Sequence, residues 1–185
     1  VARERAQLRR EAHLVIEART DPLTGLPNRR ALSEWHAAAA DWPAPGVGVL
    51  IVDLDRFKAV NDTHGHDAGD AVLKAAAARL AAVCADAAWS GRPRAARLGG
   101  EEFAVHMGAT SRREMATLAE ALRAALAAKP LALPTGRTLG VTASVGVAWS
   151  DRPLALAAML EAADIALYDA KRAGRNCVRL AACLT

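Results

Sequence analysis

Residues 97–103 read RLGGEEF and lie between two short apolar runs. A glycine pair between such runs predicts a hairpin with Gly99 and Gly100 at the centre of its turn, because a two-residue turn needs positive φ there. Two adjacent carboxylates, Glu101 and Glu102, follow the glycines. Successive strand side chains point to opposite faces, so only one of these acids faces a given site. The stretch alone fits either a surface hairpin or a turn that brings an acid to a ligand.

A second stretch favours the ligand site. Residues 46–55 read GVGVLIVDLD, an apolar, β-branched run that ends in two aspartates. Such a run predicts a buried strand, and its acids fall at the carboxyl end, where α/β sheets place ligands. Residues 56–70 follow as a dense polar segment, and we expect a loop there up to a helix that begins near residue 67. A lone acid after a strand is usually a cap, but the two stretches together predict a site for a divalent metal and a nucleotide.

These residues resemble the GGDEF family, the diguanylate cyclases, in its GGEEF form. Further matching segments are residues 21–30 (DPLTGLPNRR), 53–70, 143–148 (ASVGVA) and 163–176 (ADIALYDAKRAGRN). The resemblance covers about residues 20–181, nearly the whole chain. It implies a palm-like fold and the condensation of two GTP into cyclic di-GMP with release of two pyrophosphates.

Helix and strand patterns alternate along the chain. Apolar spacing predicts helices over residues 28–41, 67–88, 111–126 and 153–174, and strands over 46–53, 139–149 and 176–180 besides the hairpin. Ser111 and Glu114 form a capping-box pattern, and Asn28 is a cap candidate. Alternating elements with one antiparallel hairpin predict an α/β fold with a mixed sheet of about five strands flanked by helices.

The composition excludes several classes of protein. The 185 residues suit one domain, and a net charge of +4 without a basic block argues against a nucleic-acid partner. The odd, scattered cysteines Cys84, Cys177 and Cys183 fit a reducing, cytoplasmic setting. No uncharged run approaches membrane-spanning length, so we expect no membrane contact within this chain.

The first twenty residues are charged and helix-prone. Val1, Leu8 and Val15 repeat every seven residues, but glutamates occupy intervening heptad positions, so a coiled coil and a solvated helix are both compatible. The chain lacks an initiating methionine, which predicts a piece of something longer. The resemblance implies that residues 1–20 join the catalytic domain, residues 21–185, to an upstream sensory domain.

Asp53 and Glu101 are the expected metal-binding pair. Mg²⁺ prefers oxygen ligands and is usually held by one or two carboxylates plus substrate phosphates. The resemblance places ligands at both carboxylates and at the backbone carbonyl of Leu54, for Mg²⁺ or Mn²⁺, two ions per site. It also suggests Glu101 as the base for the 3′-hydroxyl, and Glu102 stays open as an alternative. Lys58 is expected to assist catalysis.

Guanine recognition is expected from Asn61 and Asp70, which match the family's base contacts. A carboxylate only accepts hydrogen bonds whereas an amide donates and accepts, which suits the pairing edge of guanine and not that of adenine. His64 and His66 form a His-x-His without a third zinc ligand nearby; His66 is expected in the loop near the nucleotide.

The triphosphate requires cations. Lys58, Lys171 and Arg175 are the candidates, and the last two are expected four residues apart on one helix face. The other substrate contacts expected are the backbone near Arg56 and Phe57 and the turn glycines Gly99 and Gly100.

The product is two-fold symmetric, so two chains must meet active site to active site as a homodimer. Residues 90–93 read SGRP where many relatives carry an Arg-x-x-Asp product-binding motif. We therefore expect no product inhibition through that site. Two alternatives stay open: a cyclase of relaxed base choice, and a GTP-binding output module without turnover.

Overall fold

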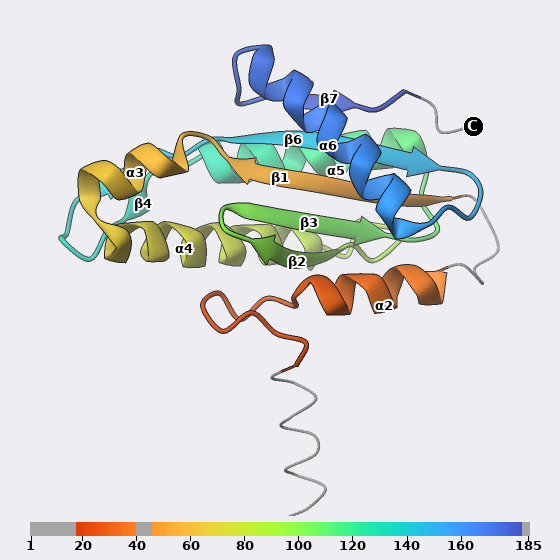
Figure 1. Cartoon of the computed structure of the whole chain (residues 1–185), viewed down its shortest axis with the longest axis horizontal. Coiled ribbons are helices and arrows are strands. Elements are labelled where there is room, and N and C mark those ends of the chain that lie inside the picture. Colours follow the sequence, from red (N-terminus) through yellow and green to blue (C-terminus); the bar gives the residue numbers. More distant parts are fainter. Residues whose placement is uncertain (1–17, 40–45, 183–185) are drawn as a thin grey trace, which may run out of the picture.

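The computed structural model describes residues 18–39 and 46–182. Figure 1 shows a twisted sheet between layers of helices. The helices are α2 (Arg29–Ala39), α3 (Phe57–His64), α4 (His66–Cys84), α5 (Arg112–Ala127) and α6 (Leu156–Arg172). The strands are β1 (Val47–Leu54), β2 (Arg94–Gly99), β3 (Glu102–Met107), β4 (Leu131–Ala132), β5 (Thr138–Leu139), β6 (Ala143–Ser150) and β7 (Val178–Leu180).

The main sheet has five strands in the order β2-β3-β1-β6-β7. The apolar β1 lies at its centre and pairs antiparallel with β3 and with β6, while β6 and β7 run parallel. The expected α/β fold with a mixed five-stranded sheet is confirmed. Strands β4 and β5 form a separate two-stranded hairpin.

Two apolar layers cover the two faces of the sheet. Leu50 and Val52 of β1 pack with residues of α4 and α5, whereas Val49 and Ile51 pack with residues of α2 and α6. Strand side chains alternate between faces, and the unbroken apolar run from Val49 to Val52 therefore supplies both layers. This double burial explains why the most apolar strand is the central one.

The segment after β1 differs from the expected loop, because most of it is helix α3. Phe57 is buried and Val60 packs against the core, so one face of this polar segment is apolar. Gly65, with φ of 83°, separates α3 from α4. Helix α4 ends at Cys84 rather than near residue 88, and Asp86 then accepts a hydrogen bond from the Ala88 N–H.

The predicted caps are confirmed. Asn28 Oδ1 accepts hydrogen bonds from the N–H groups of Arg30 and Ala31 at the start of α2, and Ser111 Oγ accepts one from Glu114 N at 3.1 Å. The expected end of the first of these helices, at residue 41, lies outside the described residues, as do residues 1–17 of the expected leading helix and Cys183.

Three boundaries in the second half also differ. The proline-bounded loop contains the β4–β5 hairpin, so the strand expected from residue 139 begins at Ala143. Helix α6 begins at Leu156, and the last strand begins at Val178. Within residues 18–39 and 46–182, no helix is both long and apolar enough to cross a membrane.

Candidate active site

Strand β1 and the β2–β3 hairpin bring acids to one end of the sheet. Asp53 lies opposite Glu102 in the β1–β3 register, and the Leu54 N–H donates to the Glu101 carbonyl at 3.4 Å. Gly99 also pairs with Glu102, so Gly100 and Glu101 are the central turn residues, one position later than predicted. Glu101 therefore stands at the tip of the turn, beside the end of β1.

The turn glycines are required by backbone conformation. Gly99 has φ of 143° and Gly100 has φ of 52°, values that favour glycine. A Cβ added at either position would meet no atom within 4 Å, so crowding is not the cause. The space beside the turn is open to a ligand.

Helix α6 supplies a cation to this end of the sheet. Lys171 Nζ lies 2.8 Å from Asp53 Oδ2, whose side chain is only 6 % exposed. The helix packs closely on β6 because Gly146 has no side chain, and a Cβ there would lie 2.0 Å from the Ala163 carbonyl oxygen. Gly146 thereby lets α6 pack close to the sheet, which helps to bring Lys171 to Asp53.

Burial and neighbouring carboxylates raise the pKa of the acids at this site. Burial raises the pKa of Asp53, an effect that Lys171 only partly offsets. Burial, followed by the charge of Asp53, raises the pKa of Glu101 and also that of Glu102. A bound cation would favour the charged form of these carboxylates, because an opposite charge nearby lowers the pKa of an acid.

Arg175 does not share a helix face with Lys171, contrary to the prediction. Helix α6 ends at Arg172, and Gly174 and Arg175 turn the chain with φ of 111° and 66°. Arg175 nevertheless stays close enough for its charge to act on Asp53.

Asp55 holds this turn in place, a role that sequence reasoning missed. Its carboxylate accepts hydrogen bonds from Thr142 Oγ1 at 2.6 Å, Ser144 Oγ at 2.7 Å and the Asn176 N–H at 3.0 Å. These donors come from the β5–β6 connection, from β6 and from the segment after α6. The one sequence signal for this role is the Asp-Leu-Asp pattern of residues 53–55, which places a second acid at the end of the strand.

A cleft of about 430 Å³ opens between α3, the β5–β6 connection and the turn after α6. Arg56, His64 and Arg175 lie among its lining residues. Arg56 adopts a left-handed conformation, with φ of 58°, just before α3. The buried Phe57 begins that helix, where the first N–H groups of a helix lack intrahelical partners.

The expected guanine contacts lie where α3 meets α4. Gly69 is buried against Asn61: a Cβ at Gly69 would lie 1.9 Å from Asn61 Oδ1. The next residue, Asp70, is exposed on α4, as is His66 at the start of that helix. Lys58 is exposed on α3. The predicted substrate residues therefore fall into two groups. Arg56 and Arg175 line the 430 Å³ cleft, whereas Asn61, Asp70, His66 and Lys58 do not.

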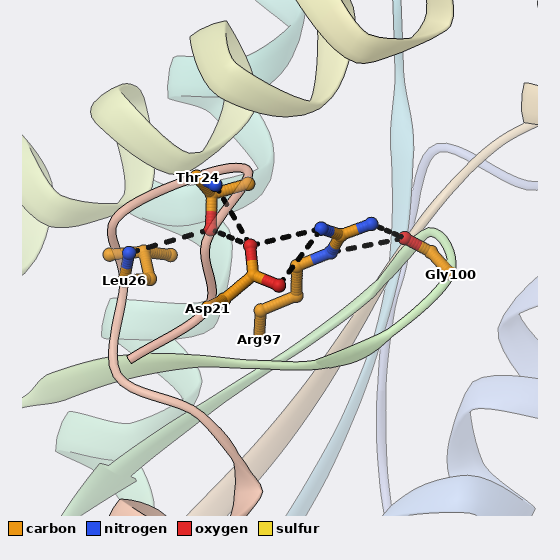
Figure 2. A network of polar contacts seen from close by, with 5 residues as sticks. All are labelled: Asp21, Thr24, Leu26, Arg97 and Gly100. Atoms are coloured by element: carbon orange, nitrogen blue, oxygen red, sulfur yellow. Dashed lines mark hydrogen bonds and ion pairs between the residues drawn. The ribbon is translucent and has the colours of Figure 1, made fainter. Parts of the chain in front are cut away.

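Arg97 ties the hairpin turn to the N-terminal segment (Figure 2). Its Nη1 lies 2.9 Å from Asp21 Oδ1, and its Nη2 donates to the Gly100 carbonyl at 2.8 Å. Thr24 donates to the same Asp21 oxygen through N–H and Oγ1. Burial raises the pKa of Asp21, but the hydrogen bonds from Thr24 and Arg97 outweigh burial and hold it below its ordinary value.

The donor set suits a hard divalent cation. Within residues 18–39 and 46–182, no three His, Cys, Asp or Glu side chains gather as a metal centre. Asp53, Glu101 and the Leu54 backbone carbonyl offer only oxygen atoms. Because Mg²⁺ needs few protein ligands when phosphates supply the rest, this small all-oxygen set fits it.

The chain is similar to a known family along most of its length. Residues 18–177 match the family described as "Diguanylate cyclase, GGDEF domain". Diguanylate cyclase DgcP of Pseudomonas aeruginosa is 44% identical over 168 residues, which are 89% of this chain and 24% of that protein. The response regulator PleD of Caulobacter vibrioides is 39% identical over 178 residues, 90% of this chain and 37% of PleD.

A solved structure is also similar. The coiled coil and GGDEF domain of DgcB from Caulobacter crescentus, in complex with c-di-GMP, superposes with a TM-score of 0.85 at 33% identity and covers 97% of this chain and 95% of that one. The chain thus spans about a quarter to two fifths of the length of DgcP and PleD, but nearly all of the DgcB chain.

Proposed function

Because the chain belongs to the GGDEF family of diguanylate cyclase domains, we propose that it condenses two GTP into cyclic di-GMP and two pyrophosphates, as the GGEEF form of the domain. The observation that carries this proposal is the acidic cluster at the hairpin turn, where the charge of Asp53, which is paired with Lys171, contributes to raising the pKa of Glu101. Such a cluster is costly for a fold unless a cation neutralises it.

Asp53, Glu101 and the Leu54 carbonyl would hold Mg²⁺ or Mn²⁺, with two ions per site when substrate phosphates share them. When bound, these ions supply charge neutralisation at the α-phosphate and at the attacking and leaving oxygens. Lys171 lies 2.8 Å from Asp53, so its ammonium can pass from this carboxylate to a phosphate oxygen.

The remaining residues would bind and orient GTP. Asn61 and Asp70 contact guanine at the α3–α4 junction, with His66 nearby, and a base lacking the matching edge leaves polar groups unpaired. The triphosphate lies along the turn and the start of α3. Its contacts are Lys58, Lys171 and Arg175, the backbone at Arg56 and Phe57, and the glycines Gly99 and Gly100, with Lys58 also supporting transfer.

Glu101 or Glu102 would accept the proton of the 3′-hydroxyl. Burial and neighbouring acids raise the pKa of both carboxyls, which makes each a stronger base than an ordinary surface glutamate. Only one of them can also serve as a metal ligand at the turn tip, and we assign that role to Glu101.

The product requires a homodimer, because each chain supplies one half of a two-fold symmetric reaction. Residues 21–185 form the cyclase domain in this proposal, and residues 1–20 link it to an upstream sensory domain in a cytoplasmic setting. Since Ser90 and Pro93 replace the charged ends of the Arg-x-x-Asp motif, the product should not inhibit through that site.

The test is chromatography of a GTP·Mg²⁺ reaction beside the Glu101→Gln variant. Cyclic di-GMP from the parent chain and a loss of at least about a hundredfold in the variant are expected, since removing a transition-state charge contact costs that much. A reaction with mixed GTP and ATP checks base choice. Protein that binds GTP·Mg²⁺ yet forms no dinucleotide even when forcibly dimerised would instead be a binding module.

A further inference from the structure

Helix α6 carries a stripe of four exposed residues on its outer face. Glu161, Ile165, Tyr168 and Arg172 recur at helical spacing, and Ile165 and Tyr168 are 60% and 61% exposed. The Arg172 guanidinium lies 5.8 Å from the centre of the Tyr168 ring. In the part of the chain that the structure describes, Leu180 is the one other exposed large hydrophobic residue, at 40%.

The stripe lies beside the candidate active site. Asp164 and Lys171 are on the α6 flank next to Tyr168, because positions 164, 168 and 171 follow helical spacing. Lys171 reaches Asp53. Any surface that covers the stripe therefore borders the site.

The stripe is complementary to itself when reversed. Its four positions are symmetric about the point between residues 166 and 167, so Ile165 mirrors Tyr168 and Glu161 mirrors Arg172. In an isologous contact residue i meets j and j meets i. Two antiparallel copies of α6 would thus stack Ile165 on Tyr168 and pair Glu161 with Arg172, each twice.

We propose that this stripe on α6 is the surface through which a second copy of the chain docks to complete the active site. The inference rests on the proposed function, since a two-fold product needs two sites side by side. A two-fold axis perpendicular to the paired helices leaves the Lys171 flank of both copies on the same side. Asp164 and Asp169 flank the stripe on opposite sides, so their charges do not meet.

Charge reversal tests the pairing. Glu161→Arg and Arg172→Glu each place like charges at both mirrored positions, and each variant should self-associate about tenfold more weakly, as two lost and reversed charge pairs imply. Mixing the two variants restores opposite charges at both positions. The mixture should therefore regain dimer and cyclic di-GMP formation that neither variant shows alone at limiting protein concentration.

The measurements are sedimentation velocity with a non-hydrolysable GTP analogue and product formation against protein concentration. Arg113→Glu is the matched control for Arg172→Glu, because it makes the same charge change on the exposed surface of α5, across the sheet. It should behave as the parent chain. Binding of the GTP analogue per protomer should be the same in all variants.

Two results would overturn the α6 contact: a mixture no more active than its components, or single variants that match Arg113→Glu at every protein concentration. Tyr168→Ala offers a further check and should weaken association without changing GTP affinity. A parent chain that makes no dinucleotide would instead remove the proposed function. An inactive parent whose dimer still responds to the charge swap would leave the docking surface standing.

Discussion

Arg97 and Asp21 form an ion pair between the hairpin turn and the segment before α2, with Nη1 and Oδ1 2.9 Å apart. Their side chains are 11% and 19% exposed. The same guanidinium donates to the Gly100 carbonyl, so the N-terminal segment and the turn share one side chain. The position of the turn therefore depends on a residue that lies 76 positions before Arg97 in the chain.

A double-mutant cycle on this pair should reveal strong coupling. Arg97→Ala and Asp21→Asn should each lower the free energy of unfolding by about 1–3 kcal/mol, because each leaves a partly buried polar partner unsatisfied. The double variant should lose much less than the sum. Urea unfolding measures all four states, with Arg30→Ala, an exposed arginine on α2, as control. Additive losses would contradict a shared network.

Removing the Lys171 ammonium should make stability more dependent on a divalent cation. Lys171→Met leaves the buried Asp53 carboxylate without its partner and should cost about 1–3 kcal/mol, a value below that of a fully buried pair because the lysine is one third exposed. Mg²⁺ or Mn²⁺ can replace the lost charge. The ion should therefore raise the melting temperature of Lys171→Met more than that of the parent chain.

Glu101→Gln is the control for that experiment, because it removes a carboxylate from the ion and should abolish most of the shift. Thermal unfolding with and without the ion, in excess chelator for the ion-free arm, provides the measurement. Equal ion-induced shifts in the parent chain and in Lys171→Met would show that Asp53 does not contact the ion.

The buried His106 should make the fold acid-sensitive. Burial, with smaller effects of the nearby His36 and Arg94 charges, lowers the pKa of His106 to about 4. Its Nε2 has no hydrogen-bond partner in the described part of the chain. Between pH 6.5 and pH 4 the unfolded chain binds the proton and the folded chain does not, so stability falls as the pH drops, by up to about 3 kcal/mol.

His106→Leu should flatten this part of the pH profile of stability, measured as the urea midpoint from pH 7 to pH 4. Val105→Ala, also buried in β3, serves as the control and should lower stability by a similar amount at every pH. A His106→Leu profile parallel to that of the parent chain would mean that another group causes the acid loss.

Gly69→Ala should act on substrate binding through Asn61. The new Cβ would lie 1.9 Å from Asn61 Oδ1 and 3.2 Å from Phe57 Cζ, so the Asn61 amide must rotate away. Loss of one base contact should raise KM for GTP about tenfold with a smaller change in kcat. Steady-state kinetics should show Asn61→Ala and the double variant to be equally impaired. A Gly69→Ala enzyme with unchanged KM would place guanine elsewhere.

The sheet and the helix caps could be predicted from the sequence, because they depend on local periodicity and on hydrogen bonds between residues close together in the chain. The apolar run ending at Asp53 could be predicted as the buried strand, and Ser111 as a cap. Helix α3 could not be predicted, because Phe57 and Val60 alone form too narrow an apolar face to give a helical pattern among the polar residues.

The tertiary ties could not be predicted from spacing. Asp55 receives hydrogen bonds from residues 87 to 121 positions away, and Arg97 meets Asp21 across 76 positions. No local pattern encodes such distances. Helical spacing predicts Arg175 on the same face as Lys171, but α6 ends at Arg172, and the chain turns at Gly174 before Arg175.

The order of strands in the sheet governs how the chain matures on the ribosome. The central strand, β1, emerges early, yet one of its two partners is β6, at residues 143–150. Until that partner has left the exit tunnel, one edge of an apolar strand stays unpaired and prone to wrong association. Nascent chains stalled before Ala143 should therefore recruit chaperones, and those extended past β6 should be released from them.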